Sequence, residues 1–163
     1  MDATDWAALV AFAAWTFLGL GAVPAATARA QYTRRWALAP PAWVFPVAWG
    51  VLYPLVAAAG FLLWHGRAGG WPYHLGLAAW AANAGLNKLW TPLYFGARRP
   101  DAALACLAAM QALAAAALVC MALAGGWQGW TALGLYAPYA LWCAFASALN
   151  VRAVVDFWNG DPF

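Results

Sequence analysis

Five apolar segments, each long enough to cross a lipid bilayer, restrict what this chain can fold into. A membrane-spanning helix needs about 20 mostly apolar residues, because the hydrocarbon core is about 30 Å thick. The predicted spans are residues 6–28, 41–64, 71–95, 102–124 and 130–155. Backbone groups in lipid must be satisfied within the segment itself, so these spans are helices. The sequence therefore predicts an all-α integral membrane protein, a bundle of five transmembrane helices forming a single domain over residues 1–163.

The scarcity of charged side chains excludes most other classes of protein. Only 8% of the residues are charged, whereas soluble domains average about 25%. The net charge of +3 comes from few groups. It therefore indicates how the chain is oriented in a membrane and not an affinity for nucleic acid.

The distribution of arginines predicts that orientation. With five spans, one end of the bundle contains Arg29, Arg34, Arg35, Arg98, Arg99 and Arg152. The other end contains only Arg67. Because cytoplasmic segments are enriched in Lys and Arg, we expect the basic connections and the C-terminus on the cytoplasmic side.

Two tryptophans and two asparagines are predicted at similar depths in the bilayer. Measured from the basic end at about 1.5 Å per residue, Trp49 and Asn87 both lie about 12 Å deep. On the same scale Asn83 lies about 18 Å deep and Trp142 about 20 Å. Because amides are costly in lipid, the face with Asn83 and Asn87 should look into the bundle. The residues leave two alternatives open, an aromatic cavity for a planar ligand or Asn–Asn bonds and packed tryptophans without a cavity.

Two other features lie on the third predicted span. Lys88 lies seven residues before Phe95, and snorkelling toward the basic side is favoured over a ligand contact. Ala81 and Gly85 form a small-xxx-small pair that faces away from the asparagines. Such a pair would suit a homodimer formed through this helix.

Residues suited to metal binding or catalysis are scarce. The three cysteines lie in apolar runs without any Cys/His cluster, so we interpret them as packing residues. His65 and His74 lie at the end opposite the predicted aromatic slab, which leaves a haem there without an axial histidine. No nucleophile–base pair or phosphate-binding loop is present. We therefore expect a non-catalytic protein with no metal site and no required cofactor.

Three sequence blocks identify a family. The first is Pro40-Pro41-Ala42-Trp43-Val44-Phe45-Pro46 with Ala48-Trp49 and Leu52-Tyr53. The second is Asn83 and Asn87 followed by Trp90-Thr91-Pro92-Leu93-Tyr94-Phe95-Gly96, and the third is Pro138-Tyr139-Ala140-Leu141-Trp142 with Leu149-Asn150. In type and order they resemble blocks of the translocator protein family, also called tryptophan-rich sensory proteins or peripheral-type benzodiazepine receptors. The resemblance covers essentially the whole chain.

The resemblance implies five helices, commonly a homodimer, and a pocket that binds porphyrins such as protoporphyrin IX and drug-like planar ligands. The family's ligand-contacting positions correspond here to Tyr32, Trp49, Asn87, Trp142 and Ala146. Together with Asn83 from the depth estimate, these are the candidate ligand-binding residues. The implied function is a receptor or transporter for tetrapyrroles. The alternative is a light- and oxygen-dependent porphyrin-degrading enzyme that uses the pocket tryptophans.

One family motif is missing, and two compartments stay open. The family's C-terminal sterol pattern needs a Tyr before a basic residue, whereas residues 149–157 contain Arg152 and no Tyr. We therefore expect no sterol binding through this motif. Family members occur in bacterial membranes and in the mitochondrial outer membrane. The abundance of Ala, Gly and Arg with a single Lys favours a bacterial cell membrane.

Overall fold

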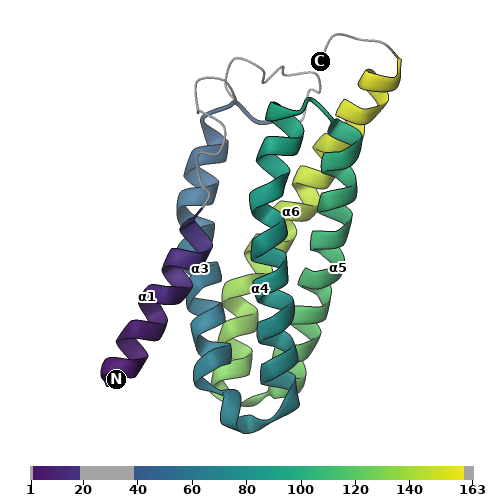
Figure 1. Cartoon of the computed structure of the whole chain (residues 1–163). Coiled ribbons are helices and arrows are strands. Elements are labelled where there is room, and N and C mark those ends of the chain that lie inside the picture. Colours follow the sequence, from purple (N-terminus) through teal and green to yellow (C-terminus); the bar gives the residue numbers. More distant parts are fainter. Residues whose placement is uncertain (1, 19–38, 160–163) are drawn as a thin grey trace.

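The computed structural model describes residues 2–18 and 39–159. This part of the chain forms five α-helices and no strand. They are α1 (Ala3–Phe17), α3 (Val44–His65), α4 (Trp71–Thr91), α5 (Pro100–Ala124) and α6 (Gly126–Trp158). Figure 1 shows α3 to α6 side by side in alternating directions, with the N-terminus at the end where α3 connects to α4. The predicted class, an all-α transmembrane helix bundle, is confirmed.

The helices differ in how clearly they qualify as membrane spans. Among the described residues, α3, α5 and α6 are long and apolar enough to cross a membrane by length and composition. Helix α4 has 21 residues, but Asn83, Asn87 and Lys88 lower its hydropathy. Helix α1 has 15 residues and ends at Phe17, because Leu18 adopts an extended backbone. Residues 19–28 of the first predicted span lie outside the described residues.

Four helices begin at residues other than those predicted, and two of them, α1 at Ala3 and α5 at Pro100, start slightly before the predicted spans. Helix α3 starts at Val44 and not at Pro41, because residues 41–44 form a turn in which the Val44 amide donates to the Pro41 carbonyl at 3.0 Å. Helix α6 starts at Gly126, so the connection predicted to span five residues is reduced to Gly125. Gly125 and Gly126 have φ values of 61° and 57°. Glycine adopts this left-handed region without strain, which permits the abrupt reversal.

The end of the third span also departs from a regular α-helix. Helix α4 ends at Thr91, and residues Pro92–Gly96 form a π-helical turn. Pro92 has no amide hydrogen to continue the ladder. The Ala97 amide instead donates to the Pro92 carbonyl at 2.8 Å. The wider turn leads into the basic connection that precedes α5.

The core lies between the four long helices. Helix α4 packs mainly on α5, α5 also packs on α6, and α3 packs on α6 and α1. Trp80, Tyr136, Tyr139 and Met110 are almost fully buried there. All three cysteines are buried and free, which confirms their interpretation as packing residues.

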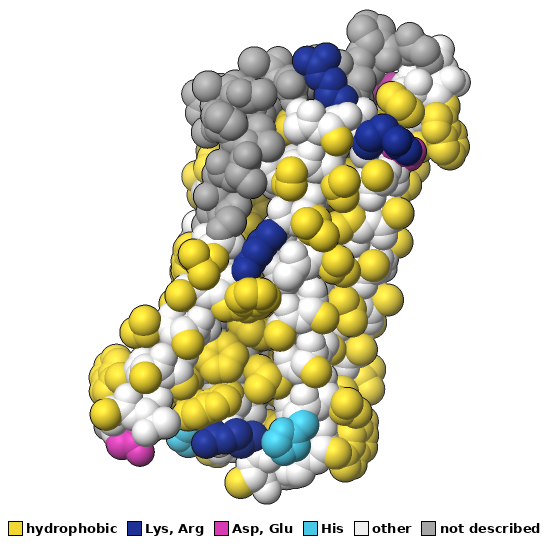
Figure 2. All heavy atoms as spheres, viewed as in Figure 1, with side chains coloured by type: hydrophobic (Ala, Val, Ile, Leu, Met, Phe, Trp, Pro, Cys, Tyr) yellow, Lys and Arg dark blue, Asp and Glu magenta, His cyan; other side chains and the backbone are white. Residues whose placement is uncertain are grey.

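Charged side chains are concentrated at the two ends of the bundle. On the face shown in Figure 2, Lys and Arg side chains lie near both ends and one lies midway among hydrophobic groups. At the end where α4 leads into α5, Arg99 pairs with Asp101 at 2.7 Å. Arg152 pairs with Asp156 at 3.2 Å on α6. The arginine-rich end and the Arg67 end are thus opposite, as the five-span arrangement requires.

Trp15 of α1 packs on the small-residue face of α4. The Trp15 indole donates to the Ala81 carbonyl at 3.4 Å, and a Cβ placed on Gly85 would lie 3.8 Å from the Trp15 ring. The Ala81/Gly85 pair therefore contacts a helix of its own chain. A homodimer stays a prediction, and a dimer through this pair would have to displace Trp15.

Helices α1, α3 and α4 meet closely at Gly60. The Trp80 indole donates to the Val56 carbonyl at 2.8 Å and packs edge-on against Phe12, with ring centroids 5.1 Å apart. A Cβ at Gly60 would lie 2.6 Å from the Trp80 ring and 3.0 Å from the Phe12 ring. Only glycine allows this contact at its present distance.

We therefore expect Gly60→Ala to lower the stability of the bundle. Overpacking a core of this kind costs about 1–3 kcal/mol. The matched control is Gly50→Ala in the same helix, where a new Cβ meets nothing within 4 Å and improves helix propensity by about 0.5–1 kcal/mol. Thermal unfolding in detergent, followed by circular dichroism, measures both. Equal midpoints for the two variants would contradict the packing argument.

Candidate ligand-binding site

Two tryptophans from different helices meet in the basic-side half of the bundle. Trp49 on α3 and Trp142 on α6 have ring centroids 6.3 Å apart and planes at 86°. Trp49 stacks on Tyr53 at 4.9 Å, because the two residues are one helical turn apart on α3. Trp142 meets Phe45 edge-on at 5.8 Å. Four rings thus form one aromatic cluster between α3 and α6.

A small cavity, here called the central cavity, lies beside this cluster. It is lined by Phe45, Trp49, Asn87, Trp90, Leu107, Met110, Trp142, Cys143 and Ala146. Its volume is about 20 Å³, enough for about one water molecule. The structure therefore brings together Trp49, Asn87, Trp142 and Ala146. Three of these belong to the group suggested by the depth estimate, and the fourth, Ala146, comes from the family resemblance.

A continuous chain of hydrogen bonds runs beside the central cavity. The Tyr53 hydroxyl donates to Asn87 Oδ1 at 3.0 Å, and Asn87 Nδ2 donates to the Tyr139 hydroxyl at 3.3 Å. The Tyr139 hydroxyl donates to Asn83 Oδ1 at 2.6 Å, and Asn83 Nδ2 donates to the Met110 carbonyl at 2.6 Å. The chain joins α3, α4, α6 and α5.

This network separates the roles of the two asparagines. Asn83 is 1% exposed, uses its carbonyl and its amino group in the network, and does not line the central cavity. Asn87 lines the cavity as well as belonging to the network. The two amides do not bond to each other in the described structure, because the Tyr139 hydroxyl lies between them. Tyr32 lies outside the described residues.

Tyr53 and Tyr139 are site residues that the sequence reasoning missed. Tyr53 follows Trp49 by four residues and Tyr139 precedes Trp142 by three. Both spacings place the phenol on the same helical face as the indole. Helical spacing around the two tryptophans was the signal that could have identified them.

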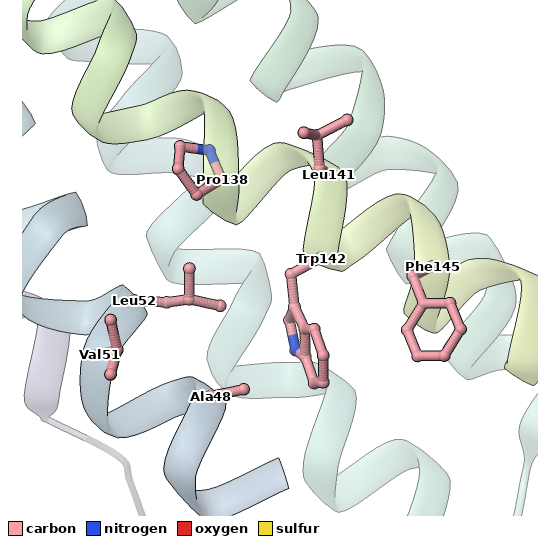
Figure 3. A pocket seen from close by; sticks show the side chains of 7 residues that line it. All are labelled: Ala48, Val51, Leu52, Pro138, Leu141, Trp142 and Phe145. Carbon is pink, nitrogen blue, oxygen red and sulfur yellow. The ribbon is translucent and has the colours of Figure 1, made fainter. Parts of the chain in front are cut away.

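Two larger grooves flank the central cavity. The first, here called the α1 groove, has a volume of about 340 Å³ and is lined by Phe17, Pro46, Trp49, Gly50, Tyr53, Asn87, Trp90 and Thr91. The second, here called the α6 groove, has a volume of about 480 Å³ and is lined by Ala48, Val51, Leu52, Pro138, Leu141, Trp142 and Phe145. Figure 3 shows Trp142 extending from α6 toward Ala48 of α3 in this second groove.

Shared side chains separate these spaces, and Asn87 and Trp90 also line both the α1 groove and the central cavity. Trp49 lines both the α1 groove and the central cavity, whereas Trp142 lines both the α6 groove and the central cavity. The indole nitrogen of Trp142 is buried and has no hydrogen-bond partner in the described part of the chain. Trp90 differs, because its indole donates to Asn150 Oδ1 at 3.1 Å. The cavity thus has a buried indole donor, that of Trp142, without an acceptor among the described residues.

The network predicts a difference between two tyrosines of α6. Tyr139→Phe leaves the buried Asn83 carbonyl without its donor, which costs about 1–3 kcal/mol. Tyr136→Phe is the matched control, because the buried Tyr136 hydroxyl has no partner among the described residues and its loss should leave stability unchanged or raised. Chemical or thermal unfolding in detergent measures both variants. A larger loss for Tyr136→Phe would argue against the assigned network.

Comparison with known proteins supports the resemblance seen in the three blocks. The TspO/MBR family profile matches residues 6–155. A tryptophan-rich sensory protein of Cereibacter sphaeroides is 33% identical over 162 residues, covering 95% of this chain and 94% of that protein. The translocator protein of Bos taurus is 34% identical over 140 residues, covering 78% of this chain and 80% of that protein.

A relative from a third organism is similarly identical over a shorter range. The tryptophan-rich protein TspO of Archaeoglobus fulgidus is 33% identical over 111 residues, covering 68% of both chains. The matched range contains all described helices apart from their outermost turns, and it includes every residue that lines the central cavity. The chain belongs to the TspO/MBR family of membrane proteins.

Proposed function

We propose that this protein binds tetrapyrroles such as protoporphyrin IX, and other planar hydrophobic ligands, between Trp49 and Trp142, and acts as a membrane receptor or transporter for them. The observation that most supports this function is the buried Trp142 indole N–H, which has no acceptor among the described residues. A buried donor left unpaired costs about 1–3 kcal/mol. A ligand with an acceptor at its edge removes this cost, and a tetrapyrrole combines such acceptors with a flat aromatic body.

The volumes indicate how such a ligand enters. Pockets for drug-sized ligands have volumes of about 300–1,000 Å³, far above the 20 Å³ of the central cavity. Rotation of Trp49 would join the cavity to the 340 Å³ of the α1 groove, and rotation of Trp142 would join it to the 480 Å³ of the α6 groove. Ligand binding in this proposal therefore displaces at least one of the two indoles.

Asn87 supplies a polar contact without leaving its network. An asparagine side chain has two N–H donors and two acceptor lone pairs. Asn87 uses one donor toward Tyr139 and one lone pair toward Tyr53. One donor and one lone pair remain, and Asn87 lines both the central cavity and the α1 groove. It can therefore bond to a polar edge of the ligand while the network holds it in place.

We expect Trp49→Ala and Trp142→Ala each to weaken protoporphyrin IX binding. Loss of ring contact on one face, worth about 0.5–1.5 kcal/mol beyond area burial, corresponds to roughly a two- to twelvefold rise in Kd. Quenching of the remaining tryptophan fluorescence during a titration measures the affinity. The control is Trp158→Ala, since Trp158 is 73% exposed at the end of α6. Unchanged affinity in both cavity variants would refute the assigned pocket.

The alternative function is light- and oxygen-dependent degradation of the bound porphyrin, and the aromatic cluster is the observation that favours it. Trp49 lies within 6.3 Å, centroid to centroid, of Tyr53, Tyr139 and Trp142. Oxidisable rings would thus surround a ligand held against Trp49. A receptor needs only their contact area, whereas degradation needs their redox chemistry.

Illumination of the purified complex separates the two functions. A degrading enzyme should lose porphyrin absorbance in light and air, and Trp49→Phe with Trp142→Phe should slow this loss at least severalfold while binding is largely kept. Absorbance recorded over time under oxygen and under argon measures the rate. Equal bleaching when free tryptophan replaces the protein would dismiss the enzymatic function and leave the receptor.

A further inference from the structure

We propose that Lys88 and Trp15 form a binding site for the carboxylate of an amphiphilic ligand whose apolar body lies in the adjoining α1 groove. The ligand is either a tetrapyrrole, in which case the inference rests on the proposed function, or a fatty acid. Both have a carboxylate attached to a large apolar body. Neither Lys88 nor Trp15 belongs to the central cavity or to the residues that line the α1 groove.

Lys88 belongs to α4, and its ammonium lies against the Trp15 ring of α1 instead of extending toward the basic end of the bundle. Lys88 Nζ is 3.4 Å from the centroid of the Trp15 ring. That ring lies alongside residues 81–88 of α4, because its N–H donates to the Ala81 carbonyl and its edge faces Gly85. The snorkelling expected from the sequence is therefore not what the structure shows.

Lys88 has no carboxylate partner among the described residues. The chain has five aspartates and no glutamate. Asp2 and Asp5 cap the start of α1, and Asp101 and Asp156 pair with arginines at the other end of the bundle. Asp161 lies outside the described residues. A charge within a membrane-spanning helix calls for a partner, and the indole ring leaves the ammonium's N–H donors available.

The α1 groove is lined in part by residues that lie within one helical turn of this pair along α1 and α4. On α4, Asn87 precedes Lys88 and Thr91 follows it by less than one turn, and both line the groove. On α1, Phe17 lines the groove two residues after Trp15 and packs against Tyr53 at 5.7 Å. The flexible four-carbon stem of lysine lets the ammonium turn between ring and groove. An apolar body against Phe17, Trp49 and Trp90 would thus leave its carboxylate near Lys88.

The position of Lys88 favours a carboxylate over a phospholipid phosphate. Lys88 lies seven residues before Phe95, about 10 Å along the helix axis. Phospholipid headgroups occupy the polar layers outside the hydrocarbon core. A carboxylate at the edge of a flat or single-chain amphiphile reaches this depth more readily, because the rest of the molecule is accommodated by the groove.

Two pairs of ligands test the proposal. Protoporphyrin IX is compared with its dimethyl ester, and oleate with methyl oleate, by fluorescence titration of the full-length protein in detergent. A hydrogen bond to a charged group corresponds to an affinity change of about tenfold or more. Lys88→Met should therefore raise the Kd of at least one free acid about tenfold. The Kd of the corresponding ester should stay within about twofold of the wild-type value. Lys88→Arg should keep most of the preference for the acid.

Arg67→Met is the matched control. Arg67 also lies over an indole, 3.9 Å from the Trp64 ring centroid, but at the opposite end of the bundle. The Arg67→Met substitution removes one positive charge and one cation–ring contact, as Lys88→Met does. It should leave the Kd of all four ligands within about twofold of the wild-type value, as expected for a screened surface charge. The outcome for Lys88→Met also identifies the ligand. If Lys88→Met weakens binding of protoporphyrin IX but not of oleate, the ligand is the tetrapyrrole. If it weakens binding of oleate but not of protoporphyrin IX, the ligand is the fatty acid.

Equal effects of Lys88→Met on acid and ester in both pairs, or no effect in either pair, would overturn the proposal. The dimethyl ester keeps this failure distinct from failure of the proposed function. If wild-type protein binds the ester and Trp142→Ala weakens that binding, the receptor function stands whatever Lys88 does. If neither porphyrin binds, the receptor function fails and the oleate pair alone decides the role of Lys88.

Discussion

The hydrogen-bonded chain of Tyr53, Asn87, Tyr139 and Asn83, which ends on the Met110 carbonyl of α5, fixes the relative positions of the four helices around the central cavity. In the interior of a membrane protein no bulk water competes for these groups, so each bond constrains both distance and orientation. A second set of bonds acts nearer the basic end. There Asn150 accepts from the Trp90 indole and donates to the Pro100 carbonyl, which ties α6 to α4 and α5.

This arrangement divides the site into a fixed part and a part that can move. The amides and phenols are held by several partners on different helices, so their displacement would leave buried polar groups unpaired. Trp142 has no such constraint, because its indole nitrogen has no partner in the described structure. In the described structure Trp49 is held by ring contacts with Tyr53, Tyr139 and Trp142. A ligand can therefore displace indoles at a lower cost than it can displace the asparagines.

Much of the fold and part of the site follow from one-dimensional properties of the sequence. The lengths of the apolar segments predict the helices, and depth along each helix predicts that Trp49, Asn87 and Trp142 meet. Depth gives no angular position around the bundle axis, so it could not separate Asn83, which faces Met110, from Asn87, which faces the cavity. The start of α6 was missed because hydropathy does not register the left-handed backbone of Gly125 and Gly126.

The environment of Lys88 is another feature that depth along the helix could not predict. Its depth was known from the sequence, but its environment depends on where Trp15 of α1 lies, and no property of α4 specifies that contact. The structure thereby links Lys88 to Trp49, since the α1 groove beside Lys88 and the central cavity share the Trp49 ring as a wall. A rigid planar ligand that reached both Lys88 and the Trp142 nitrogen would have to displace that ring from its stack on Tyr53. The hydroxyl of Tyr53 would still be bonded to Asn87, so the ring could move without disrupting the network that holds the helices together.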